Sequence, residues 1–125
     1  KVFFGQKNGD LSESCDIVHS VDRMASSKVA IYRAVIQELL KGPTLSEKNA
    51  GYFTSIPSGV ALKSIAAAAQ GVVPADFTKA LDQGVAGSCR VENIRSQIFV
   101  TLKQFPEVRD VIISINGRTD DILQP

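Results

Sequence analysis

A helix followed by a strand is predicted by "SCRVENIRSQIFVTLKQFPEVRDVIISING", residues 88–117. Apolar residues recur at helical spacing as far as about Gln104: Val91, Ile94, Ile98, Leu102 and Phe105. Ser88 is the expected N-cap, and Phe105-Pro106 ends the helix. From Asp110 to Asn116 a strand is expected with Val111, Ile113 and Ile115 on one face. Polar residues of the helix are expected away from its apolar stripe: Arg90, Asn93, Gln97 and Lys103.

The N-terminal half predicts one more strand and one more long helix. Lys1–Phe4 is a short apolar strand, Asn8-Gly9-Asp10 a turn, and residues 11–27 a polar segment without periodicity. From Lys28 to Lys41 a wide apolar face recurs at helical spacing, and Gly42-Pro43 ends that helix. Thr44-Leu45-Ser46-Glu47 fits a capping box, which predicts a short helical turn ending near Gly51.

Residues 60–77 allow two interpretations. Ala66–Ala69 favours a helix, because alanine has the best intrinsic helix propensity. The pattern around it favours a hairpin, with strands over about 60–69 and 72–77 and a turn at Gln70-Gly71. Because Pro74 lacks an N–H, the second strand is expected to be an edge or to carry a bulge there. We adopt the hairpin.

The expected fold is α+β in the order strand, helix, strand, strand, helix, strand. Two helices pack on one face of a small, mostly antiparallel sheet, and residues 1–125 form a single domain. The core expected between the helices and the sheet consists of Val35, Leu39, Ile94, Ile98, Leu102, Val111 and Ile113.

Composition excludes several classes of function. Apolar residues make up 44% and charged residues 22%, which is globular rather than disordered. A formal charge of +1 gives no electrostatic footprint for nucleic acid or an anionic membrane. No apolar run reaches the roughly 18 residues of a membrane span. The chain opens directly on a strand pattern, so we expect it to be part of a longer protein whose targeting segment lies outside it.

Cys89 is the first candidate for chemistry. A helix N-terminus and Arg90 would favour its thiolate, but a nucleophile needs a base, and His19, the only histidine, lies near Cys15 instead. Two cysteines without a CxxC motif are too few ligands for structural zinc. The remaining alternatives are a Cys15–Cys89 disulfide, in an oxidising compartment, or two inert thiols, in a reducing one.

Three weaker candidates complete the search for a site. His19 is interpreted as a surface or partly buried histidine, and Asp120-Asp121 as solvated carboxylates rather than cation ligands. Gly84–Gly87 with Ser88 lacks the lysine of a phosphate loop, so it is interpreted as a tight turn. We therefore expect no catalytic residues, no metal and no cofactor.

Four segments together resemble one family. They are "ELLKGPT" at 38–44, "GYFTSIPSGVALKSI" at 51–65, "ADFTKAL" at 75–81 and "SQIFVTLKQFPEVRDVIISING" at 96–117. In this order they resemble the GerMN domain, the sporulation and spore-germination domain of extracytoplasmic, often lipid-anchored bacterial proteins. Pro74 and the two cysteines depart from the family pattern. No functional residues carry over, since the family's signature positions are fold positions.

The resemblance implies a non-enzymatic domain of the cell envelope. GerMN domains look related to the ring-building domains of a spore-envelope channel, so the expected partners are envelope proteins or further copies of the chain. An extracytoplasmic location, with a lipid or signal segment outside this chain as the only membrane anchor, favours the Cys15–Cys89 disulfide. The alternative function is binding of cell-wall glycan or peptide. With no Trp and only Tyr32 and Tyr52 besides phenylalanine, the chain is poor in sugar-stacking rings.

Overall fold

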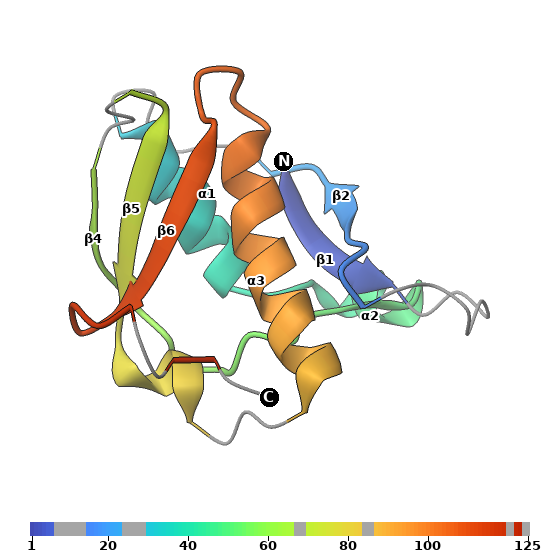
Figure 1. Ribbon diagram of the computed structural model, residues 1–125. Coiled ribbons are helices and arrows are strands. Elements are labelled where there is room, and N and C mark those ends of the chain that lie inside the picture. Colours follow the sequence, from blue (N-terminus) through green and yellow to red (C-terminus); the bar gives the residue numbers. More distant parts are fainter. Residues whose placement is uncertain (7–14, 24–29, 67–69, 84–86, 120–121, 124–125) are drawn as a thin grey trace.

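The computed structural model describes residues 1–6, 15–23, 30–66, 70–83, 87–119 and 122–123 (Figure 1). Its helices are α1 (Ile31–Leu40), α2 (Leu45–Asn49), the 3-10 turn η1 (Lys79–Asp82) and α3 (Ser88–Lys103). Its strands are β1 (Val2–Gln6), β2 (His19–Val21), β3 (Tyr52–Phe53), β4 (Leu62–Ile65), β5 (Val72–Phe77) and β6 (Asp110–Ile115). The α+β class and the predicted order of the main elements are confirmed.

The strands form two small sheets, so the prediction of one sheet is wrong. One sheet has the order β2-β1-β3 and the other β4-β5-β6. All their pairs are antiparallel except β5 and β6, which run parallel from Val72 opposite Asp110 to Phe77 opposite Ile115. Strand β1 cannot join β5, because β4 and β6 already flank β5 on both sides.

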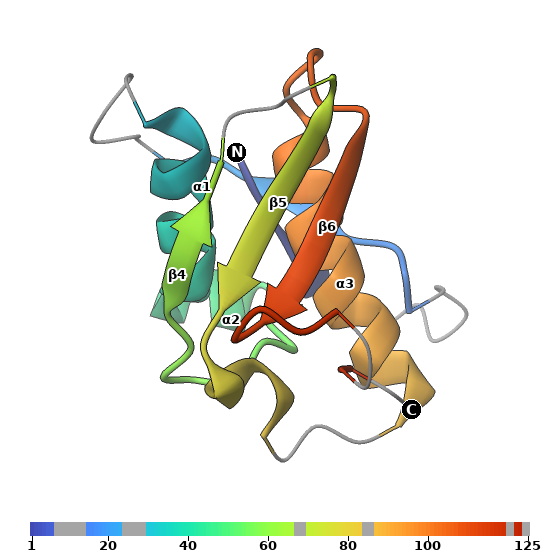
Figure 2. The same ribbon diagram turned by 60° about the vertical axis from the view of Figure 1, so that its left-hand side comes forward.

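Helices α1 and α3 lie between the two sheets. They pack against each other and both contact β1; α1 also contacts β4, and α3 contacts β6. Figures 1 and 2 show the same arrangement from two sides, with the β4-β5-β6 sheet on one side of the helices and β1 on the other. The large apolar side chains that are fully buried come from both sheets, both long helices and η1: Val2, Phe4, Ile36, Leu39, Val73, Phe77, Leu81, Ile94, Ile98 and Leu102.

The predicted end of α1 and start of α2 are confirmed. Gly42 has a φ of +80°, a left-handed conformation that favours glycine after a helix. The Thr44 hydroxyl accepts from the Glu47 N–H (3.3 Å), and the Glu47 carboxylate accepts from the Thr44 N–H (2.9 Å). This is the capping box read from the sequence, and it begins the short helix Leu45–Asn49.

The predicted hairpin is also confirmed, since β4 pairs with β5 antiparallel. Gln70 and Gly71, at the predicted turn, both have positive φ, a conformation found in turns. The expectation that Pro74 makes β5 an edge is wrong, because β5 is the central strand. Pro74 is tolerated because it lies beyond the last β4–β5 pair, where its carbonyl accepts from the Ala66 N–H (3.2 Å). The irregularity in the pairing lies between Leu62 and Ser64 instead.

Several local predictions need correction. Gly87, with a φ of +90°, is the N-cap of α3, and Ser88 is its first helical residue. The segment 11–27 contains β2, which pairs His19 with Phe4. Of the predicted core, Val111 and Ile113 are only half-buried, because β6 is an edge strand that α3 covers in part; Val35, Leu39, Ile94, Ile98 and Leu102 are buried. The expected turn Asn8–Asp10 and residues 28–29 and 67–69 lie outside the described residues.

Candidate functional site

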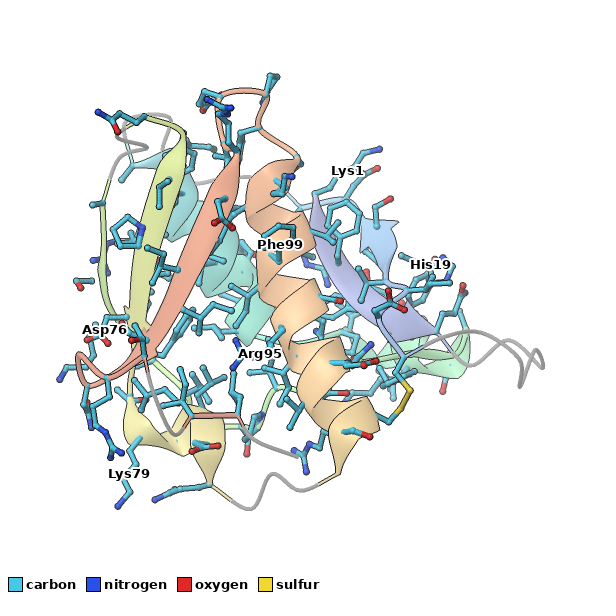
Figure 3. The ribbon with its side chains drawn as sticks, in the orientation of Figure 1. Lys1, His19, Asp76, Lys79, Arg95 and Phe99 are labelled. Atoms are coloured by element: carbon cyan, nitrogen blue, oxygen red, sulfur yellow. A yellow bond between two sulfur atoms is a disulfide. The ribbon has the colours of Figure 1, made fainter. Side chains whose placement is uncertain are left out.

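Cys15 and Cys89 are joined by a disulfide in the structure, with their Cα atoms 5.2 Å apart. Cys89 lies in the first turn of α3, and Cys15 lies four residues before β2 (Figure 3). The bond therefore ties the segment that leads to β2 onto the start of the long helix. Because the Cys89 sulfur is bonded to that of Cys15, Cys89 has no thiolate and cannot act as the nucleophile considered from the sequence.

Three buried polar residues form a stripe along α3, close to the disulfide. Asn93, Gln97 and Thr101 follow one another at four-residue spacing, and all three are buried. The sequence interpretation, which set Asn93 and Gln97 away from the packed face, is wrong. No local signal marks their burial, because asparagine and glutamine are mostly exposed in proteins.

Each polar group of this stripe has a partner. The Asn93 amide donates to the Cys15 carbonyl (2.9 Å) and accepts from the Ser55 hydroxyl (2.8 Å). The Gln97 amide accepts from the Ser55 N–H (2.8 Å) and donates to the Thr54 hydroxyl (2.9 Å). The Thr101 hydroxyl accepts from the N–H of Phe3 in β1 (3.2 Å). The stripe fixes the segment between β3 and β4 and is structural rather than an open site.

One face of the β4-β5-β6 sheet is left uncovered by the described helices. Figure 2 shows α1 and α3 behind this sheet, and apart from the turn after β6 no described element crosses its other side. Side chains of alternate residues point to this side, as the strand register and the alternating burial of β5 require. We call this side the outer face; its residues are Ser64, Val72, Pro74, Asp76, Asp110, Ile112 and Ser114.

The outer face combines an apolar pair with a polar hollow. Pro74 and Ile112 lie opposite each other in the register, both are exposed, and Ile112 is 45% exposed. Beside them, Asp76 accepts from the Ser114 hydroxyl (2.7 Å) and the Gly117 N–H (2.8 Å). The hydrogen bond from the Gly117 N–H lowers the pKa of Asp76 most, and the hydrogen bond from the Ser114 hydroxyl lowers it further. The carboxylate therefore stays ionised in a hollow of about 330 Å³.

Of the remaining sequence candidates, the structure describes His19. His19 lies on β2, opposite Phe4. Asp120, Asp121 and residues 84–86 lie outside the described residues. Within the described ranges, no three His, Cys, Asp or Glu side chains are grouped so that they could hold a metal ion. Among these residues, also, no helix has the length and apolar character that a membrane crossing requires.

The two tyrosines are used for packing. The Tyr32 ring meets Phe105 edge-on, with centroids 5.3 Å apart, and its hydroxyl donates to the carboxylate of Glu107. Burial and that hydrogen bond raise the pKa of Tyr32 to about 12. Tyr52 is half-buried in β3. Neither ring lies on the outer face, where a sugar would need a stacking platform.

Comparison with known families gives one match over almost the whole chain. The model of the family Germane, described as sporulation and spore germination, matches residues 1–121. Among curated proteins, none matches the chain.

The solved structures that share the fold include the following three. A candidate lipoprotein from Clostridium perfringens is 17% identical with a TM-score of 0.62, and the match covers 74% of this chain and 59% of that one. The tandem GerMN domains of the sporulation protein GerM from Bacillus subtilis are 16% identical with a TM-score of 0.60, over 94% of this chain and 38% of that one. The first GerMN domain of the same protein is 20% identical with a TM-score of 0.61, and the match covers 82% of this chain and 74% of that one. The chain thus spans about three-fifths of the first of these proteins.

Proposed function

This chain belongs to the Germane family of sporulation and spore germination domains, and on that premise we propose that it is a non-enzymatic domain of the bacterial cell envelope that works by binding other proteins. The outer face carries this proposal. It sets the exposed Pro74 and Ile112 beside the ionised Asp76, and an apolar patch with a polar rim is what protein interfaces use.

The location is also part of the proposal. We place the domain outside the cytoplasm, attached to the membrane through a segment outside this chain. The disulfide supports this, because such bonds persist in oxidising compartments. The Clostridium perfringens protein that shares the fold is a candidate lipoprotein, which is in keeping with the same location.

Binding of cell-wall glycan is the second candidate, and the structure gives it less support. Tyr32 is occupied by Phe105 and Glu107, and Tyr52 is half-buried. Purified cell wall should therefore not retain the domain in a pull-down, whereas a protein crosslinking screen should give adducts.

Two variants with equally exposed residues make the test specific. Ile112 on the outer face and Ile17 before β2 are 45% and 44% exposed. Ile112→Asp should reduce the yield of crosslinked adducts at least tenfold, and Ile17→Asp should leave it unchanged. Equal yields from both variants would contradict the outer face as the interface. Hydrolysis of peptidoglycan fragments or esters, abolished by a single substitution, would contradict the non-enzymatic proposal.

A further inference from the structure

A second surface of different character lies between α3 and β6. Arg95, Ser96 and Phe99 of α3, with Val111 and Ile113 of β6, line a shallow groove of about 200 Å³. Phe99, Val111 and Ile113 are all half-buried, so three large apolar side chains face solvent together. Figure 3 shows Arg95 and Phe99 on the side of α3 that is turned toward the viewer, next to β6. We call this surface the α3–β6 groove.

The free edge of β6 borders this groove. Even-numbered residues along β6 point their backbone toward β5: the Asp110 N–H donates to the carbonyl of Gly71, just before β5, and the N–H of Asn116, just after β6, donates to that of Phe77. The backbone of Val111, Ile113 and Ile115 therefore points away from β5.

The chain itself closes both ends of that edge. The Asp110 carboxylate accepts from the Val111 N–H (2.9 Å). At the other end Ile115 and Arg118 exchange two backbone hydrogen bonds, of 2.9 and 3.0 Å. Only the N–H and C=O of Ile113 and the C=O of Val111 remain open between these closures, with no partner among the described residues. This gap fits the backbone of about three residues of an added strand.

Cations flank the apolar part of the groove. Arg95, Phe99 and Lys103 follow at four-residue spacing along α3. The Lys103 ammonium lies 5.1 Å from the centroid of the Phe99 ring, and Arg95 donates to the Ile122 carbonyl (3.2 Å). A ligand that covers Phe99 would therefore meet positive charge at both ends.

We propose that the α3–β6 groove binds a short extended segment of a partner protein, apolar in its centre and acidic at its ends. The segment pairs with the backbone of Ile113 and lays alternate side chains on Phe99. The inference rests on the proposed function, because it assigns a second contact to a protein-binding domain.

A second copy of the chain does not fit this edge. If two β6 strands paired antiparallel about Ile113, Val111 of the second copy would lie opposite Ile115 of the first. If they paired parallel, Ile115 of the second copy would lie opposite Ile115 of the first. Arg118 already occupies the edge of Ile115. The occupant is therefore a segment short enough to end before that closure.

The test uses the whole chain and a defined probe. The probe is a blocked seven-residue peptide of alternating valine and threonine with an aspartate at each end; its control has lysines at the ends. In an NMR titration, the aspartate peptide should shift the Ile113 amide and slow its hydrogen exchange, and it should bind at least tenfold more tightly than the lysine peptide.

Variants locate the contact. Ile113→Pro removes an N–H that faces away from β5, so the β5–β6 pairing can persist, and it also replaces one side chain that lines the groove. It should weaken binding at least tenfold, and so should Phe99→Asp, which leaves the strand unchanged. Ile112→Thr, on the outer face, should change binding less than twofold.

Three results would overturn the inference. They are no binding of the aspartate peptide at millimolar concentration, binding that leaves the Ile113 amide unperturbed, and equal binding by Phe99→Asp. A dimer in sedimentation that Phe99→Asp dissociates would show the groove to be a self-contact and would also overturn it. If the peptide fails while the Ile112-dependent adducts persist, only this inference falls; if those adducts are absent too, the proposed function falls with it.

Discussion

The amide of Asn93 donates a hydrogen bond to the carbonyl oxygen of Cys15, one helical turn beyond the disulfide that joins Cys15 to Cys89. The same short segment is thus held to α3 once covalently and once by a buried hydrogen bond. Because Asn93 also binds Ser55, this end of α3 connects the segment before β2 with the segment before β4. Loss of the disulfide should loosen this junction without removing every contact that holds it.

Replacing both cysteines by serine should lower the free energy of unfolding by about 2–5 kcal/mol. The bond closes a loop across a sequence separation of 74, and its main effect is to restrict the unfolded chain. Urea unfolding of wild type with and without reductant gives the measurement, and the double variant, which should not respond to reductant, is the control. Two reactive thiols in protein purified from an oxidising compartment would contradict the bond.

Gln97→Leu should lower the free energy of unfolding by about 1–3 kcal/mol. The substitution nearly keeps the side-chain size but leaves the Ser55 N–H without its partner, while the Thr54 hydroxyl keeps only its bond from the Ile56 N–H. Gln37 on α1 is exposed, so Gln37→Leu is the matched control and should change stability by less than about 0.5 kcal/mol. If thermal and urea unfolding find Gln97→Leu as stable as wild type, the buried polar stripe does not stabilise the fold.

Acid should remove the contribution of the Arg23–Glu47 ion pair. Hydrogen bonds from the Arg23 guanidinium, at 2.5 and 2.8 Å, lower the pKa of Glu47 to about 2, and the Thr44 N–H adds to the effect. Since the folded pKa lies below that of the unfolded chain, the stabilisation is present above about pH 4.5 and is lost as the pH falls toward 2. We expect its size to be on the order of 2 kcal/mol.

Urea unfolding of wild type and Glu47→Gln between pH 7 and pH 2 measures this contribution. The two proteins should differ most above pH 5 and converge near pH 2. Glu92→Gln, at an exposed carboxylate on α3, should stay within about 0.5 kcal/mol of wild type at neutral pH. A constant difference between wild type and Glu47→Gln at every pH would contradict the assignment of the shift to this pair.

Gly71→Ala should destabilise the fold more than Gly59→Ala. Both glycines have a φ near +85°, so each substitution carries a backbone cost of about 1 kcal/mol. An added Cβ meets nothing at Gly59, whereas at Gly71 it would lie 2.6 Å from the Arg109 side chain. Chemical denaturation of both variants gives the comparison, and Arg109→Ala in the Gly71→Ala background should reduce the difference. Equal losses would show that Arg109 moves aside freely.

Most local elements could be predicted because their signals lie within a few residues. The capping box at Thr44 and Glu47 and the turn at Gln70-Gly71 depend on local hydrogen bonds and backbone conformation, which the sequence specifies directly. Strand β2 could not be found in this way. Its three residues show no alternation of apolar and polar side chains in the sequence, and the strand forms because it pairs with the edge of β1.

The division into two sheets and the polar stripe depend on packing rather than local pattern. Whether β1 joins β6 or forms a sheet with β2 and β3 is decided by the helices between them. Asn93 and Gln97 have an exposed appearance in the sequence, and only the segment at Thr54 and Ser55, some 40 residues away, buries them. Of the candidate interface, Pro74 stands out in the sequence because it lacks an N–H, but no local pattern marks its exposed neighbour Ile112, since β-strand register alone brings the two together.

Site-specific photo-crosslinking of the exported domain tests the central claim, that the outer face binds a protein. A photoreactive residue is placed at Ile112 in one sample and at the equally exposed Ile17 in another. Illumination in the cell envelope followed by mass spectrometry should give a discrete protein adduct from position 112 and none from position 17. Equal adducts from both positions, or none from position 112, would contradict the claim.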